Sequence, residues 1–237
     1  MILLEEITGR KMTDAVLELK NIKRWFGDGE KKLEVLKGVN FKIKKGEIIA
    51  LEGPSGSGKS TLLYVTGLLD KPSDGELYLA GQSCAKMKEV ERTQTRRKYL
   101  GFVYQSHLLL PDFTCLENVM MPLLISGVDK KEAAQKATDL LDKMGLKHRL
   151  KHRPGEMSGG EQQRAAVARA LVHSPALLLA DEPTGNLDPK TSEKVFAELL
   201  SIVKETGLSA LIATHNPALA EKMDRRVRLE NGIVVES

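Results

Sequence analysis

The feature that most constrains the fold is a glycine-rich loop between an apolar strand and a helix. The loop GPSGSGKST follows the apolar run EIIALEG and precedes the helical run STLLYVTGLL. It matches the pattern G-x-x-x-x-G-K-[ST], in which glycines let backbone N–H groups fold around phosphate oxygens. Lys59 would neutralise the outer phosphates, and the Ser60 hydroxyl would reach Mg²⁺. The predicted phosphate ligands are Gly53, Pro54, Ser55, Gly56, Ser57, Gly58, Lys59, Ser60 and Thr61.

Apolar strands alternate with helical segments along most of the chain. The runs ALLLADEP at 176–183 and LSALIATH at 208–215 are predicted to be buried strands. Strands of this kind form parallel sheets that are covered on both faces. The runs VLELKNIKRWF and LEVLKGVNFKIKKG instead alternate around a turn, and RVRLENGIVVE predicts a hairpin around Asn231-Gly232. We therefore expect an α/β fold that also contains antiparallel strands.

The middle of the chain, roughly 106–156, is predicted to be helical. In PDFTCLENVMMPLLIS, Thr114 and Glu117 have the spacing of a capping box in front of an apolar run. In DKKEAAQKATDLLDKMG at 129–145, apolar residues recur at helical spacing until Gly145 ends the pattern. The helical block thus lies between two α/β portions of the chain.

Polar side chains follow three of the predicted strands, at the edge where parallel sheets bind ligands. Asp181 and Glu182 end one strand, His215 ends another, and Gln105 follows the short strand in GFVYQSH. Beside a phosphate loop, Asp181 is expected to anchor Mg²⁺ and Glu182 to act as general base on the attacking water. His215 is expected to contact the terminal phosphate, and Gln105 to reach Mg²⁺ or the water. Taken singly, each residue also has a purely structural interpretation.

Two aromatic residues, Trp25 and Phe26, lie at the end of the first predicted strand. One aromatic ring at this place can stack on an adenine face, and we favour Trp25 for this role. Burial of both rings in the core is the alternative.

A second candidate phosphate cradle lies in PGEMSGGEQQRAAVARAL at 154–171. Ser158, Gly159 and Gly160 precede a long helical stretch, so they would leave backbone N–H groups bare at a helix end that favours anions. No lysine accompanies this cradle, and the first loop already accounts for the chain's own nucleotide. We therefore predict that it binds a terminal phosphate held by Lys59 of another subunit.

Composition excludes several classes of protein. The 237 residues contain no apolar run near the roughly 20 residues of a membrane span, and the first residues, MILLEEITGRK, do not resemble a secretory signal. Cys84 and Cys115 form no CxxC pair, so free thiols in a reducing compartment are expected. The net charge of +4 suits an anionic membrane face, whereas the 4% aromatic content and the lack of a basic–aromatic stripe argue against nucleic acid.

From residue 14 onward the motifs resemble those of the nucleotide-binding subunits of ATP-binding cassette (ABC) transporters. GPSGSGKST resembles the Walker A loop, LLLADEP the Walker B strand, YQ at 104–105 the Q-loop, MSGGE the signature, GNLD at 185–188 the D-loop and ATH at 213–215 the switch histidine. The signature departs from the common LSGGQ at Met157 and Glu161. Its Ser-Gly-Gly core is intact, so we expect no loss of function from these departures.

The resemblance implies a P-loop NTPase (RecA-like) core with a mixed/parallel sheet, an antiparallel β subdomain and an inserted α-helical subdomain. It implies an ATPase that uses ATP and Mg²⁺, with two copies facing head to tail around two ATP molecules, and it adds Asp188 to the nucleotide-binding residues. The expected boundaries are an N-terminal extension over 1–12 and a single ABC ATPase domain over 13–237. Within that domain, 106–156 would be the helical subdomain, and 13–105 with 157–237 the α/β core and β subdomain.

Within this family, the chain most resembles the lipoprotein-releasing branch, the LolD type. LLPDFTCLENV is the most telling stretch, and the macrolide-exporter (MacB) and cell-division (FtsE) relatives remain alternatives. The resemblance implies a homodimer on the cytoplasmic face of the inner membrane, bound to integral membrane permease subunits like LolC and LolE, with no nucleic acid. Phe113, Leu116, Met120 and Met121 are expected to offer these partners an adaptable apolar surface, unless they form the core of the helical block.

Two other classes of function are weighed against this interpretation. One is a P-loop ATPase that works on nucleic acid. DNA-repair relatives of this fold carry long coiled coils or zinc modules between the Walker A loop and the signature, and 106–156 contains neither sustained heptads nor paired cysteines. A nucleotide sensor without turnover would have no need of Glu182 and His215.

Overall fold

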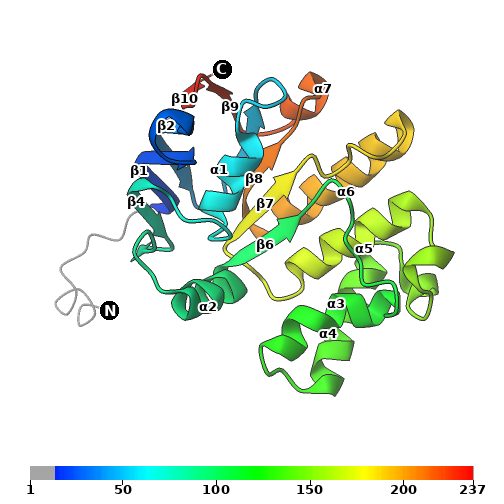
Figure 1. Cartoon of the computed structure of the whole chain (residues 1–237). Coiled ribbons are helices and arrows are strands. Elements are labelled where there is room, and N and C mark those ends of the chain that lie inside the picture. The colour runs from blue at the N-terminus through cyan, green and yellow to red at the C-terminus, as the bar shows by residue number, and fades with distance from the viewer. Residues whose placement is uncertain (1–13, 237) are drawn as a thin grey trace.

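A six-stranded sheet forms the centre of the molecule in the computed structural model, which describes residues 14–236 (Figure 1). The strand order is β10-β9-β3-β8-β7-β6, and all neighbours are parallel except β9 and β10. The strands are β3 (Ile48–Glu52), β6 (Leu100–Val103), β7 (Leu177–Asp181), β8 (Ser209–Ala213), β9 (Arg225–Glu230) and β10 (Ile233–Glu236). The predicted mixed, mainly parallel sheet is confirmed, as is the final hairpin, in which Asn231 and Gly232 both have positive φ.

The first part of the chain forms a separate antiparallel sheet with the order β2-β1-β4-β5. Its strands are β1 (Ala15–Phe26), β2 (Leu33–Lys44), β4 (Asp74–Leu79) and β5 (Gln82–Ser83), and the short helix η1 (Gly29–Lys31) joins β1 to β2. The strands alternate buried and exposed residues because one face of the sheet packs on the core and the other faces solvent. The expected antiparallel sheet is therefore confirmed.

Helices connect the strands of the central sheet. They are α1 (Lys59–Thr66), α2 (Glu89–Tyr99), α6 (Pro189–Thr206) and α7 (Pro217–Ala220). The sequence pattern does not predict α2, because its segment EVERTQTRRKY lacks an apolar stripe. This helix is held in part by arginines, since Arg92 and Arg96 both donate to the backbone oxygen of Leu68, at 2.7 and 2.6 Å.

A group of helices lies beside β6, on the opposite side of the molecule from the antiparallel sheet (Figure 1). It contains α3 (Cys115–Ile125), α4 (Lys130–Lys143), the short helices η2 (Lys147–Arg149) and η3 (Pro154–Glu156), and the start of α5 (Gly159–Leu171). The capping box of Thr114 and Glu117 is present at the start of α3. Asp129 caps α4 alone, because Glu132 pairs with Lys136 instead of the cap backbone.

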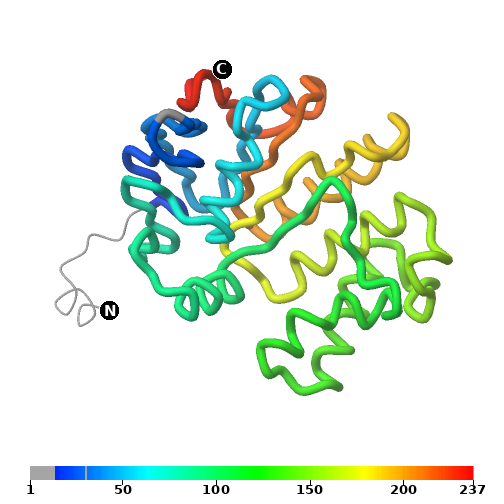
Figure 2. Tube along the Cα trace, viewed as in Figure 1, coloured from blue at the N-terminus to red at the C-terminus, as the bar shows by residue number. Residues whose placement is uncertain are grey.

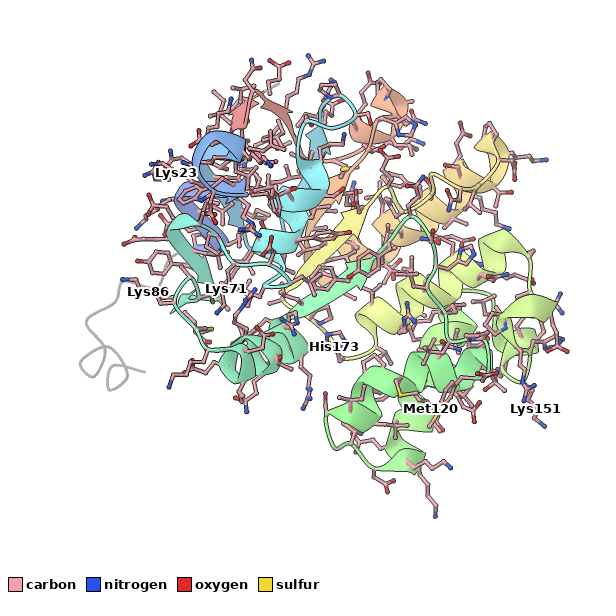
Figure 3. The ribbon with its side chains drawn as sticks, in the orientation of Figure 1. Lys23, Lys71, Lys86, Met120, Lys151 and His173 are labelled. Carbon is pink, nitrogen blue, oxygen red and sulfur yellow. The ribbon has the colours of Figure 1, made fainter. Side chains whose placement is uncertain are left out.

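Two expected surface residues of this group, Met120 and Leu116, pack on the hydrophobic core instead. Met120 is only 4% exposed and belongs to the main hydrophobic cluster, on which Leu116 also packs (Figure 3). The side chains of Met120 and Leu116 lie on the face of α3 that packs on α4 and α5, so only Phe113 and Met121 of the four predicted residues remain available.

Residues of β3, β7 and β8 alternate between two hydrophobic clusters. In β3, Ile48 and Ala50 join the cluster shared with α3, α4, α5 and α6, whereas Ile49 and Leu51 join the cluster shared with α1 and the antiparallel sheet. Burial on both faces explains why these strands are continuously apolar. The predicted extension, residues 1–12, lies outside the described residues, and the predicted subdomain boundaries stay predictions.

Candidate functional site

The glycine-rich loop wraps its backbone around the side chain of Lys59, the first residue of α1. The Nζ atom of Lys59 donates to the backbone oxygens of Gly53 (2.8 Å) and Pro54 (3.0 Å), and the residue is buried. Gly58, the N-cap of α1, has a φ of 101°, in the left-handed region that favours glycine. The lysine charge and the unpaired N–H groups of a helix start therefore meet at one place, which favours phosphate binding.

Two features of the loop test whether a triphosphate fits it. A Cβ atom at Gly53 would lie 2.7 Å from the backbone oxygen of Leu229 and 2.8 Å from Ser57 Oγ, so the close approach requires glycine. The hydroxyl of Ser57 is buried and has no hydrogen-bond partner among the described residues. A buried polar group left unpaired costs about 1–3 kcal/mol, so a ligand oxygen that paired with this hydroxyl would be stabilised. The unpaired Ser57 hydroxyl thus suits a phosphate oxygen, whereas Gly53 is required by the packing of the loop on Leu229.

A cavity of about 610 Å³ connects the loop with the carboxyl ends of the parallel strands. The segments that follow β6 and β7 reach the same edge of the sheet (Figure 2). The cavity is lined by Val35, Gly53, Ser55, Gly56, Gly58, Lys59, Ser60, Thr61, Gln105, Asp181, Glu182 and His215. The fold thus brings together the loop and all four polar residues that were predicted at strand ends, while Pro54 lines an adjoining cavity with His215.

Glu182 and His215 are in direct contact across the end of the sheet. The Nδ1 atom of His215 lies 2.6 Å from Glu182 Oε2, and the side chains are 69% and 20% exposed, respectively. Glu182 follows β7 with a φ of 47°, and its N–H donates to the backbone oxygen of Ala213 at 3.0 Å. The carboxylate is therefore fixed at the cavity and paired with an imidazole that solvent reaches.

The loop after β6, which carries Gln105, is held by side chains of α5. Gln163 donates from Nε2 to the backbone oxygen of Tyr104 at 3.2 Å, and Arg169 donates to the backbone oxygens of His107 and Leu108. Sequence reasoning missed Gln163 and Arg169 because neither belongs to a motif. Only the packing of α5 beside this loop gives them a role.

Besides Pro54 and the residues of the second cradle, three predicted nucleotide-binding residues do not line the cavity, namely Ser57, Trp25 and Asp188. The ring of Trp25 lies 4.2 Å from the Nζ atom of Lys32, and its backbone N–H donates to Ser73 Oγ at 3.2 Å. Asp188 is the N-cap of α6, where Oδ1 accepts from the N–H of Thr191 at 3.1 Å. The binding roles of Trp25 and Asp188 stay predictions.

The second cradle forms the start of α5 and does not line the cavity around Lys59. Ser158 is the N-cap, and its hydroxyl accepts from the N–H of Glu161 at 3.4 Å. Glu161 Oε2 in turn accepts from the N–H and the hydroxyl of Ser158, at 2.8 and 3.0 Å. A Cβ atom at Gly160 would lie 2.7 Å from Thr191 Cγ2, so α5 meets α6 closely there. Within one chain, the two cradles are separate.

Glu161 also accepts from a residue that no motif contains. The Nε atom of Arg149, at the end of η2, donates to Glu161 Oε1 at 2.8 Å, and Glu161 is 9% exposed. Burial would raise the pKa of this carboxyl, but hydrogen bonds from Arg149 and Ser158 outweigh burial and lower the pKa to about 2. Glu161 is therefore a charged group beside the cradle.

A groove of about 400 Å³ lies between α2, β6, α3 and α5. Its lining includes the apolar residues Phe102, Met121 and Ile125 and the basic residues Arg96, Arg97 and Arg169. His173, just after the end of α5, also lines it and is labelled between α2 and the helical group in Figure 3. Sequence reasoning found only Met121 of this set, because the groove joins segments that are far apart in the chain.

Comparison with known proteins gives consistent matches. Residues 36–185 match the ABC transporter family. The lipoprotein-releasing system ATP-binding protein LolD of Paramagnetospirillum magneticum is 56% identical over 225 residues, which cover 95% of this chain and all of that protein. LolD 1 of Rhodospirillum rubrum is 55% identical and covers 94% of this chain and 99% of its own length.

Solved structures also resemble this chain closely. A dimeric post-hydrolysis state of the ATP-binding cassette MJ0796, bound to ADP and Pi, has a TM-score of 0.84 at 38% identity, covering 93% of this chain and 98% of that one. A second dimeric structure of MJ0796, described as a bacterial ABC transporter cassette, has a TM-score of 0.84 at 40% identity and covers 92% and 96%. Among the described helices of the present chain, none has the length and apolar character needed to cross a membrane.

Proposed function

This chain belongs to the ABC transporter family and is an ATP-binding, ATP-hydrolysing subunit, and from this premise we propose that it drives the release of lipoproteins from the inner membrane toward the outer membrane. The observation that carries the proposal is the identity of more than half of the residues with LolD proteins over nearly the whole chain. Relatives of the MacB and FtsE types are the alternatives.

The side chains at the cavity suggest a division of roles in hydrolysis. Lys59 leaves the backbone oxygens of Gly53 and Pro54 to neutralise the outer phosphates of ATP, while the N–H groups at the start of α1 hold their oxygens. Glu182 takes a proton from the attacking water, and His215, now 2.6 Å from that carboxylate, orients it and meets the terminal phosphate.

A Mg²⁺ ion fits this arrangement through Ser60, Gln105 and Asp181. All three line the same cavity, and a hydroxyl, an amide oxygen and one carboxylate are the sparse set of protein ligands that Mg²⁺ takes beside substrate phosphates. The ion would supply charge neutralisation between the phosphates. No group of three or more His, Cys, Asp and Glu side chains suited to a metal occurs among residues 14–236.

Two copies of the chain are proposed to sandwich two ATP molecules. Lys59, Glu182 and His215 share one cavity, whereas Ser158, Gly159 and Gly160 are outside it, so each chain carries two halves of different sites. The dimeric state of the MJ0796 structures supports this arrangement. ATP would then join the two subunits, and hydrolysis would let them separate.

Integral membrane permease subunits, like LolC and LolE, are proposed to bind in the groove between α2, β6, α3 and α5. Its apolar lining residues suit the apolar face of a short helix, and Arg96 and Arg169 suit acidic groups beside it. The chain would thus lie peripherally on the cytoplasmic face of the inner membrane.

The test is purification of the chain from its native membranes in detergent. We expect it to purify with integral membrane subunits that have large periplasmic domains, and we expect ATP to drive release of a lipidated protein from proteoliposomes of this complex. Glu182→Gln in the same complex is the control, and it should bind ATP without release. DNA-stimulated turnover, or a complex that moves drugs or activates cell-wall hydrolysis but not lipoproteins, would contradict the proposal.

A further inference from the structure

Glu161 places a negative charge beside the cradle that is proposed to receive a partner's terminal phosphate. Its Oε2 atom is within 3.0 Å of both the N–H and the hydroxyl of Ser158, and the carboxyl is charged at neutral pH because its pKa is about 2. A phosphate that approached Ser158 would meet this carboxylate at short range. Like charges a few ångströms apart repel strongly near a protein surface, so the cradle requires a compensating cation.

Arg149 supplies that cation. Its Nε atom donates to Glu161 Oε1, the oxygen that does not contact Ser158, at 2.8 Å, and its side chain is 31% exposed. His148 is the other basic side chain near this oxygen, at 3.5 Å, and it is 61% exposed. The two carboxylate oxygens thus have separate tasks, since one binds Arg149 and the other orients Ser158.

The backbone next to Arg149 is held in place by hydrogen bonds to α3. The next turn of chain is bonded to the start of α3, where the N–H groups of Cys115 and Leu116 donate to the backbone oxygens of His152 (2.8 Å) and Leu150 (3.0 Å). The Nη1 atom of Arg149 lies 3.2 Å from His152 Nε2. The chain that follows Arg149 is therefore held by the same helix that lines the groove, and the guanidinium group itself contacts Glu161 and His152.

We infer that Arg149 is a positioning residue for the composite ATP site: it neutralises Glu161 and so lets the Ser158 cradle accept the terminal phosphate of the ATP held by a second copy of this chain. The inference rests on the proposed sandwich and deepens it. Arg149 touches neither nucleotide nor water in this role, because it acts through Glu161.

The test uses the full-length chain with Glu182→Gln, so that ATP-bound dimers accumulate. The ATP concentration for half-maximal dimer formation is measured by light scattering after size exclusion, for Arg149→Met, Glu161→Gln and the double variant. We expect Arg149→Met to raise this concentration by about tenfold or more at low salt, and by less at 0.5 M salt, because an unpaired carboxylate then repels the phosphate. Glu161→Gln and the double variant should both remain close to the parent, because the amide carries no charge.

Two controls separate the possible causes of failure. Lys147→Met removes a cation from the same short helix, η2, but that lysine pairs with Asp142 and not with Glu161, so it should leave dimer formation unchanged. ADP binding to the monomer reports the Lys59 loop and should be unchanged in every variant. If Arg149→Met does not fold, Arg149→Lys tests the same point, because it keeps the charge and should dimerise like the parent.

Different results test the role of Arg149 and the proposed ATP-bound dimer. Recovery of dimer formation when Glu161→Gln is added to Arg149→Met supports the inference, since a merely structural arginine would not be rescued by removal of a carboxylate. A double variant as impaired as Arg149→Met, a normal Arg149→Met or an impaired Arg149→Lys would overturn it. If the parent chain with Glu182→Gln binds ADP but never dimerises on ATP, the proposed sandwich itself fails.

Discussion

At the scale of the residue, Glu182 has the position that a general base requires. It lines the cavity with Lys59, and its carboxylate contacts His215. We expect Glu182→Gln to bind ATP normally and to hydrolyse it about 10²–10⁴ times more slowly, since an amide has the same shape but takes no proton. Phosphate release at saturating ATP measures the effect, and Glu198→Gln, on α6 and outside the cavity, is the matched control. ATP hydrolysis by this variant at the wild-type rate would show that Glu182 is not the general base.

The Glu161 carboxyl gives the free energy of unfolding a predictable dependence on pH. Its pKa lies near 2 in the folded chain, below its ordinary value of 4.5. Because the pKa is lowered, the carboxyl's stabilising contribution to the free energy of unfolding is complete above about pH 4.5 and is lost as the pH falls toward 2. The upper limit of this contribution is about 3 kcal/mol. Urea unfolding of the wild type and of Glu161→Gln should therefore differ most at neutral pH and converge below pH 4.5. A difference that stays constant from pH 7 to pH 3 would contradict the assignment.

At the scale of the element, α3 has two faces with different tasks. One face carries Val119 and Met120 into the core, and the other presents Met121 and Ile125 to the groove, where Ile125 is 56% exposed. In an isolated chain, an apolar side chain this exposed buries little of its surface. Beside Arg96 and Arg169 it can instead anchor a partner's helix.

We expect Ile125→Glu to weaken binding to the membrane subunits by about 30-fold, in line with the loss of one interface anchor worth about 2 kcal/mol. ATP binding by the isolated chain should not change, because the groove and the Lys59 cavity share no lining residue. Affinity for the detergent-solubilised membrane subunits is the measurement. Val90→Glu is the matched control, because Val90 is 69% exposed on α2 and outside the groove. Equal binding by both variants would place the contact elsewhere.

At the scale of the whole molecule, the separation of the Lys59 cavity from the Ser158 cradle makes a prediction about mixed dimers. The experiment is carried out in a Glu182→Gln background. When one subunit carries Lys59→Ala and the other carries Ser158→Arg, both lesions fall in the same composite site. The second composite site should then remain intact. Both lesions in one subunit, paired with an unaltered subunit, should leave none. Trapped ATP in differently tagged, isolated dimers is the readout. The reverse ranking, with trapping only when both lesions share a subunit, would show that the sites form within one chain.

What the sequence determined by itself is the chemistry that depends on neighbours along the chain. The loop at Gly53–Thr61 contains its own lysine and helix start, and the apolar runs of β3, β7 and β8 alternate between two cores, so pattern alone predicted the phosphate site and the sheet. Because parallel strands end at one edge, the sequence also predicted that Asp181, Glu182 and His215 would meet.

The features that only the tertiary structure decided are those that depend on contacts between distant segments of the chain. Met120 and Met121 are neighbouring apolar residues of one helix. Met120 packs in the cluster shared with α4 and α5, whereas Met121 lines the groove, because contacts with other helices set the rotation of α3. The polar helix α2 has no apolar stripe from which it could be predicted. Hydrogen bonds from Arg92 and Arg96 to the backbone oxygen of Leu68 hold it in place. Arg149 lies 12 residues before Glu161 and outside every motif. A charge pair of this kind follows from how η2 folds back on α5, and no local pattern in the sequence encodes that distance.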